Sequence, residues 1–282
     1  MTPRQIVMRT VTIITLATAA PAAAVQQYPW TDDVDSSETL SARIAAPAGY
    51  QRVEAAESSF AAWLRGLPLR ADSARVRLYD GSLRDDQSVQ HAVVALDIGT
   101  KDLQQCADIA IRLYAEYLYA YQRIDDIAFM FTSGDTASYR QWIDGWRPSV
   151  NGNTVTWRQT ATADSSYDGF RRYLDTVFMY AGSYSLERDL PRRQGPAAAM
   201  PGDLYIDGGF PGHVVILLDV AVHTETGERI ALLAQGFTPA QDVHVLTNPV
   251  DDRLSPWYRC NFGSRLVTPD WKFYPGDLHY FE

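Results

Sequence analysis

Two neighbouring apolar segments constrain the fold of this chain more than any other feature. Pro201–Ile206 is a turn that leads into an apolar run, and Gly212–Leu218 begins a second apolar run after a glycine-rich stretch. Short apolar runs bounded by Gly and Pro are typical of strands, and their spacing predicts that the two strands pair through a tight reversal. His213 opens the second strand, so the fold should hold its imidazole rigidly at the rim of a sheet.

Cys106, one of only two cysteines, lies far upstream at the predicted start of a long helix. Asp102 is the predicted N-cap, and Gln105 three positions later completes a capping-box pattern. Backbone N–H groups and the helix dipole near such a start favour a thiolate, so we expect a lowered thiol pKa. Two other interpretations stay open: a small buried residue, or a disulfide to Cys260.

A thiol near a helix start and a histidine at a strand end are the two parts of a cysteine hydrolase. Such a base needs a third group that fixes its ring, and Gln235 ends the returning apolar strand 230–234. His213 could instead serve the backbone alone, and Gln235 could be an ordinary edge amide. Gln104 and Gln105 flank Cys106, and either side chain could donate to an oxyanion.

Two acidic residues compete for roles near this hairpin. Asp219 lies six residues along the strand from His213, about 20 Å away, which is too far for contact. Asp203 follows the Pro-Gly turn, where a carboxylate commonly accepts from backbone N–H groups. The histidines lack the spacing of metal motifs, and neither a phosphate-binding loop nor an esterase nucleophile elbow is present, so we expect no metal and no cofactor.

The start of the chain has the pattern of a secretory signal peptide over residues 1–24, with two arginines, a short apolar run and an Ala-x-Ala ending. We expect cleavage near Ala24 and an exported protein, periplasmic or secreted, with no integral membrane segment. Losing Arg4 and Arg9 without any acid moves the net charge from −9 to −11. An acidic protein is a poor partner for nucleic acid.

Residues 25–282 are predicted to form a single α+β domain with an N-terminal arm over about residues 25–50. Hydrophobic periodicity predicts further elements. The helices are expected at 60–64, 139–146 and 167–183; the strands at 75–79, 92–98, 129–131, 154–157 and 243–246; and a packed coil from Asn248 to the C-terminus.

Residues Pro201–Ile206 and Gly212–Ile216 resemble the core hairpin of papain-like cell-wall peptidases of the NlpC type. In those proteins a Gly-Asp-Leu strand precedes the strand that opens with the catalytic histidine, and the cysteine starts an earlier helix. The resemblance implies a papain-like fold with Cys106 as nucleophile, His213 as base and Gln235 as orienting group. This chain departs from the pattern at the nucleophile, which reads Gln-Gln-Cys-Ala-Asp, and in its longer second hairpin.

A longer resemblance runs from about residue 45 to the C-terminus. Leu103–Asp108, Pro201–Asp219 and Leu232–Gln241 are similar to a family of exported bacterial proteins that is catalogued only as a domain of unknown function. That likeness implies a shared Cys/His site and names no substrate.

These observations lead to two hypotheses about function. The first is a cysteine hydrolase or acyltransferase that acts on an amide bond of a cell-envelope peptide, glycan or other acyl substrate, most simply as a monomer. The second is a non-catalytic module on the same fold that binds a glycan or a peptide, for which the many tryptophans and tyrosines are suited.

Overall fold

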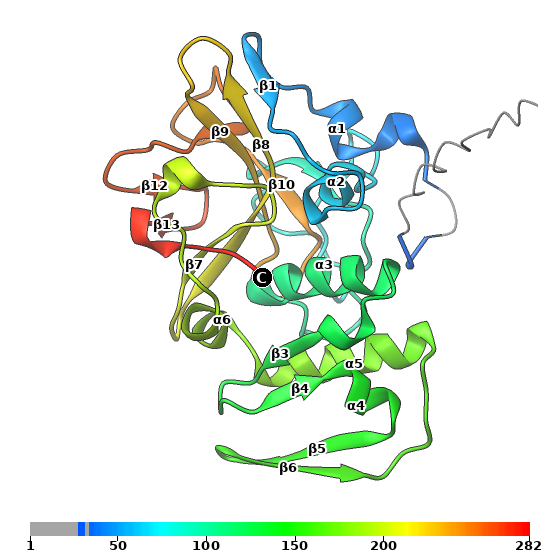
Figure 1. Cartoon of the computed structure of the whole chain (residues 1–282). Coiled ribbons are helices and arrows are strands. Elements are labelled where there is room, and N and C mark those ends of the chain that lie inside the picture. Colours follow the sequence, from blue (N-terminus) through cyan, green and yellow to red (C-terminus); the bar gives the residue numbers. More distant parts are fainter. Residues whose placement is uncertain (1–27, 32–33) are drawn as a thin grey trace, which may run out of the picture.

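The computed structural model describes residues 28–31 and 34–282 (Figure 1). The predicted signal peptide and the first part of the predicted arm lie outside these residues. In the described ranges, no helix combines the length and the apolar character that a membrane crossing requires.

An antiparallel sheet forms the centre of the molecule, in the order β14-β7-β8-β9-β10-β2, with β1 also paired to β8 and β11 to β9. Together with the helices it gives an α+β architecture, as predicted. The strands of this sheet are β1 (Tyr50–Arg52), β2 (Gln90–Val93), β7 (Leu204–Asp207), β8 (His213–His223), β9 (Arg229–Gln235), β10 (His244–Leu246), β11 (Trp257–Arg259) and β14 (Leu278–His279).

The predicted hairpin is present as β7 and β8, which pair with Asp207 opposite His213. Both faces of β8 are buried. Val214 and Ile216 belong to the larger core beneath the helices, whereas Val215 and Leu217 belong to a second core on the other face of the sheet. A strand covered on both faces needs apolar residues at successive positions, which explains why these runs do not alternate with polar residues.

Helices cover one face of the sheet. Helix α3 packs against β8 and β9, α2 packs against β8 and α3, and α5 lies below α3 with two small hairpins (Figure 1). The helices are α1 (Leu40–Arg43), α2 (Phe60–Arg65), α3 (Cys106–Ala120), α4 (Tyr139–Ile143), α5 (Tyr167–Tyr180) and α6 (Ser183–Asp189); the hairpins are β3 (Ala128–Met130) with β4 (Thr136–Ser138), and β5 (Trp146–Asn151) with β6 (Thr154–Gln159).

Four element predictions need correction. The helix expected over 167–183 is two helices, because the chain is extended at Ala181 and Gly182 between α5 and α6. The stretch 75–79 forms only isolated bridges, and the strand expected over 92–98 is β2, which begins earlier and ends at Val93. The segment after Asn248 is not coil throughout: it contains β11, β14 and the hairpin of β12 (Leu266–Val267) and β13 (Lys272–Phe273).

Candidate active site

Cys106 is the first residue of α3, and Gln105 is the N-cap. The Gln105 N–H donates to the Asp108 carboxylate at 2.9 Å. The predicted cap at Asp102 is therefore wrong by one turn. The Asp102 carboxylate instead accepts from the Ala240 backbone N–H at 2.7 Å and from the Gln105 amide at 3.0 Å. The Asp102 side chain, which the local sequence predicts as the helix cap, thus binds a distant segment of the chain instead.

Two glycines allow close packing here, α3 against the end of β9 and the turn before β8 against the start of α6. A Cβ at Gly236, just after β9, would come within 2.7 Å of Ile109 and within 3.3 Å of the Gln105 carbonyl. A Cβ at Gly212 would come within 2.3 Å of the Ser183 hydroxyl oxygen. The first turn of α3 thus lies against the end of β9, beside the start of β8.

This packing puts the Cys106 sulfur against the backbone N–H of Val214, the residue after His213. The thiol is only partly exposed. Burial raises its pKa to about 11, with the neighbouring Asp108 carboxyl acting in the same direction, and the N–H groups of Val214 and of the first helical turn lower it less. The lowered pKa expected from the helix start is therefore wrong. Desolvation outweighs the helix terminus.

His213 and Gln235 are brought together as predicted. The ring Nε2 lies 2.8 Å from the Gln235 Oε1, and both side chains are 1% exposed. A buried amide at this distance fixes the angle of the imidazole ring. This is the role of the orienting residue in a nucleophile–base–orienter arrangement.

Two further residues fix which way the Gln235 amide faces. Its Nε2 donates to the Asp270 carboxylate at 2.6 Å, and Asp270 also accepts from Arg84 at 2.6 Å. An ionised carboxylate can only accept, so the NH₂ end of the amide must face Asp270 and the oxygen must face His213. The residues Arg84, Asp270, Gln235 and His213 thus form one directed chain, which we call the relay.

The relay determines the tautomer of His213. Because the Gln235 oxygen only accepts, the His213 Nε2 carries the proton and Nδ1 holds a lone pair. His244, opposite Gln235 in the β9–β10 pair, fits the same pattern: its Nδ1 donates to the Asp242 carbonyl at 2.9 Å, so its Nε2 accepts from the Gln235 amide at 3.4 Å. In the described part of the chain, neither the thiol nor any other group is hydrogen-bonded to the His213 Nδ1.

Aromatic side chains enclose the His213 ring. The Phe237, Trp271 and Phe273 rings lie 5.1, 5.3 and 6.0 Å from it, centroid to centroid. Burial lowers the pKa of His213 to about 4, against smaller raising effects from Gln235 and Asp270. The imidazole is therefore neutral near pH 7, as a general base must be before it takes a proton.

A cavity of about 430 Å³ opens beside the thiol. Cys106 lines it, whereas His213 and Gln235 are not among its lining residues. Of the two oxyanion candidates, Gln105 lines this cavity. Gln104 is buried elsewhere, with its amide oxygen accepting from Arg112 at 2.6 Å. The backbone N–H groups of the first turn of α3 are therefore the more direct donors toward a group that enters the cavity.

The remaining candidates lie away from the relay. Cys260 is a free thiol in the second core, on the face of the sheet opposite α3, and Cys106 is free as well. Asp219 is fully buried and accepts from Arg52 and Arg65 at 2.5 and 2.7 Å, so it closes an ion-pair cluster. Within residues 28–31 and 34–282, no group of three or more His, Cys, Asp or Glu side chains could hold a metal.

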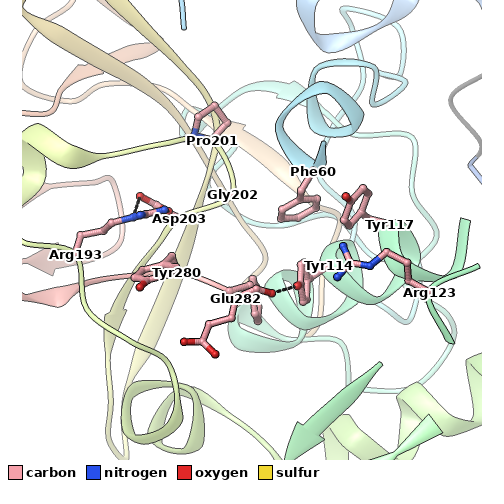
Figure 2. Close-up of a pocket in the computed structure, with 11 residues that line it drawn as sticks. Phe60, Tyr114, Tyr117, Arg123, Arg193, Pro201, Gly202, Asp203, Tyr280 and Glu282 are labelled. Atoms are coloured by element: carbon pink, nitrogen blue, oxygen red, sulfur yellow. Dashed lines mark hydrogen bonds and ion pairs between the residues drawn. The ribbon is translucent and has the colours of Figure 1, made fainter. Parts of the chain in front are cut away.

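Asp203 takes part in a second, smaller pocket of about 210 Å³, shown in Figure 2. Its carboxylate accepts from Arg193 through two hydrogen bonds of 2.8 and 2.9 Å and from the Met200 backbone N–H. Rings of Phe60 and Tyr114 form the opposite wall (Figure 2). The predicted capping role of Asp203 is present, with an ion pair added.

The comparisons with known proteins give one result. A family model described as domain of unknown function (4846) matches residues 40–280. The chain belongs to this family. No curated protein and no solved structure gives a match to the chain. The domain-of-unknown-function family covers the whole sheet, α3 and the relay, so the site is part of the family's domain.

Sequence reasoning missed half of the relay. Asp270 and Arg84 carry no local signal, since each lies in an irregular stretch far from His213 in the sequence. His244 offers a faint signal, as a polar residue within the short apolar strand predicted over 243–246, after Gln235. In the sequence, Trp271 is one of many aromatic residues with no distinguishing signal, although its indole N–H donates to Asp207 at 2.9 Å and its ring packs on His213.

Proposed function

We propose that this protein is a cysteine hydrolase or acyltransferase with a papain-like core, acting on an amide bond of a cell-envelope substrate. One observation carries the proposal: the relay holds a neutral His213 with its Nδ1 lone pair free, and the Cys106 sulfur rests on the next backbone amide. The signal peptide predicted from the sequence supports an envelope substrate.

The reaction follows from the protonation states of the two groups. The Cys106 thiol transfers its proton to the His213 Nδ1 as the sulfur attacks the substrate carbonyl carbon. N–H groups of the first turn of α3 bind the resulting oxyanion. The imidazolium then protonates the leaving amine, and a thioester remains on Cys106. Water hydrolyses the thioester, or an acceptor amine or alcohol takes the acyl group. For the first transfer, Cys106 and His213 must close to hydrogen-bond distance, as catalytic pairs often do only with substrate bound.

The test compares two histidines of one strand. Purified protein is incubated with an activated acyl ester, and the acyl adduct on Cys106 is followed by intact-mass spectrometry. His213→Ala should slow adduct formation about 10²–10³-fold, since it removes the general base. His223→Ala, at the other end of β8, is the matched control and should leave the rate unchanged. Equal rates in the two variants would contradict the proposal.

The second hypothesis, a module that only binds a glycan or peptide, is favoured by the pocket of Figure 2. Its wall of rings, with the Arg193–Asp203 pair beside it, is the kind of surface on which sugars and peptides stack. It predicts that cell-wall fragments bind with the same affinity to the wild type and to Cys106→Ser, and that no acyl adduct forms.

A further inference from the structure

We infer that the cavity beside Cys106 selects an uncharged acyl group with an apolar chain. The inference deepens the proposed function, because it takes Cys106 as the attacking atom and asks what the adjoining cavity accepts. It rests on the chemistry of the cavity walls.

One wall of the cavity is apolar. Phe178 and Met179, near the end of α5, line it together with the loop residues Phe210 and Pro211. A volume of about 430 Å³ is within the range of small-molecule sites, which are commonly lined by apolar residues with a few polar groups. This wall would bury a hydrocarbon chain rather than a hydrated one.

The apolar surface continues out of the cavity onto its rim. Phe210 is 84% exposed and Met179 is 52% exposed, and the Phe210 ring contacts the partly exposed Tyr184 at 5.9 Å. Large side chains exposed together are unusual unless they contact a ligand or partner. Here they adjoin the one partly exposed thiol of the described chain, which indicates that the occupant is the substrate's acyl portion.

The charge of the cavity is of one sign. Asp102 and Asp108 are part of its lining, and no lysine, arginine or histidine is among the described lining residues. Arg188, whose guanidinium lies 5.9 Å from the Tyr184 ring, is paired with the Asp189 carboxylate. An anionic acyl group would meet carboxyl groups and no compensating cation.

Asp108 contributes to the cavity lining a buried side-chain oxygen that has no hydrogen-bond partner among the described residues. The Oδ2 of this buried residue accepts from the Gln105 N–H, whereas Oδ1 is buried and has no partner among the described residues. Burial raises the pKa of Asp108 well above its usual range. A substrate amide, which can both donate and accept, would satisfy Oδ1 whether or not the carboxyl group is ionised.

Alkylation of Cys106 tests this inference without requiring turnover. Iodoacetamide and iodoacetate deliver groups of similar size that differ in charge, and N-hexyl iodoacetamide adds an apolar chain to the neutral reagent. Second-order rates at Cys106 are measured by peptide mapping and divided by the rates with glutathione. We expect the neutral reagent to be favoured over the anion about tenfold, and the hexyl reagent over its parent at least about tenfold, since each buried methylene contributes up to about fourfold.

Two pairs of variants sharpen the test. Phe210→Ala should reduce the advantage of the hexyl reagent, whereas Tyr274→Ala, which removes an exposed ring that is not part of the cavity, should not. Met179→Lys should raise the rate with iodoacetate severalfold, whereas Met130→Lys, an exposed methionine outside this cavity, should not.

Corrected rates that are equal for all three reagents would overturn the inference, as would a thiol that no reagent modifies before unfolding. Failure of the proposed function has a different signature. In that case the reagent preferences persist, but His213→Ala and His223→Ala form the acyl adduct at the same rate.

Discussion

Replacing Asp270 with asparagine should reverse the tautomer of His213. The introduced amide has one oxygen, and the charged guanidinium of Arg84 is the stronger donor for it. The NH₂ group of the introduced asparagine then faces Gln235. The Gln235 amide turns over, so that its oxygen accepts from this NH₂ group. The Gln235 NH₂ group would now face the His213 Nε2, which must accept, and the ring proton moves to Nδ1. A base with a proton on Nδ1 cannot take one from a thiol.

The size of the effect follows from the hydrogen bonds that change. The 2.6 Å bond from Arg84 loses its ionised acceptor, and the 2.6 Å bond from Gln235 is reversed rather than lost. We expect the free energy of unfolding to fall by about 1–3 kcal/mol, the range for one hydrogen bond to a charged group. The acyl-transfer rate should fall by up to about the 10²–10³-fold expected for His213→Ala, because a base in the wrong tautomer loses most of its contribution.

Asp207→Asn is the matched control. Asp207 also carries a charge that raises the pKa of His213, but it binds the Trp271 indole and not the Gln235 amide. Nitrogen NMR of the His213 ring reports the tautomer, and the mass of the acyl adduct reports the rate. If Asp270→Asn keeps the proton on Nε2, or slows acylation no more than Asp207→Asn does, the relay does not determine the tautomer.

Three further outcomes are expected. Asp219→Asn should destabilise the fold by about 3–5 kcal/mol in chemical denaturation, because Arg52 and Arg65 lose a buried ionised partner, yet leave the acylation rate of the folded protein unchanged. Folding lowers the pKa of His213 from 6.5 to about 4, so the unfolded chain takes up the proton first as the pH falls. The free energy of unfolding of the wild type, relative to that of His213→Gln, should therefore fall between pH 7 and pH 4 by at most about 3 kcal/mol. A Cys260→Ser variant should lower the melting temperature but keep the full alkylation signal of α3, since that thiol lies in the second core.

The parts of the site that could be predicted are those that regular structure positions. His213 and Gln235 occupy the ends of two long apolar strands, so pairing of β8 with β9 brings the two side chains near each other whatever the loops do. Asp270 and Arg84 are positioned by short irregular segments. Whether Asp270 reaches Arg84 and Gln235 depends on how the chain after Asn248 folds over the second face of the sheet. The hydrophobic periodicity of the sequence does not indicate that folding.

The start of α3 shows the opposite case, in which a clear local signal gave the wrong residue. Aspartate is a far better N-cap than glutamine on intrinsic preference. Here, however, the Asp102 carboxylate serves the Ala240 N–H across the molecule, and Asp108 inside the helix satisfies the N–H of Gln105. A capping preference is worth about 1 kcal/mol, so a tertiary contact that competes for the same carboxylate oxygen can override it.

The same competition sets the chemistry of the thiol. A helix N-terminus stabilises a nearby anion by about 0.3–1 kcal/mol at exposed positions, which corresponds to less than one unit of pKa. Packing Cys106 against β8 removes water from the sulfur, and this loss of solvation destabilises the thiolate more than the helix terminus stabilises it. The resting site therefore holds a neutral thiol and a neutral imidazole rather than an ion pair. For the reaction proposed above, such a site requires a base whose tautomer is fixed in advance, and the hydrogen bonds of Arg84, Asp270 and Gln235 fix the tautomer of His213.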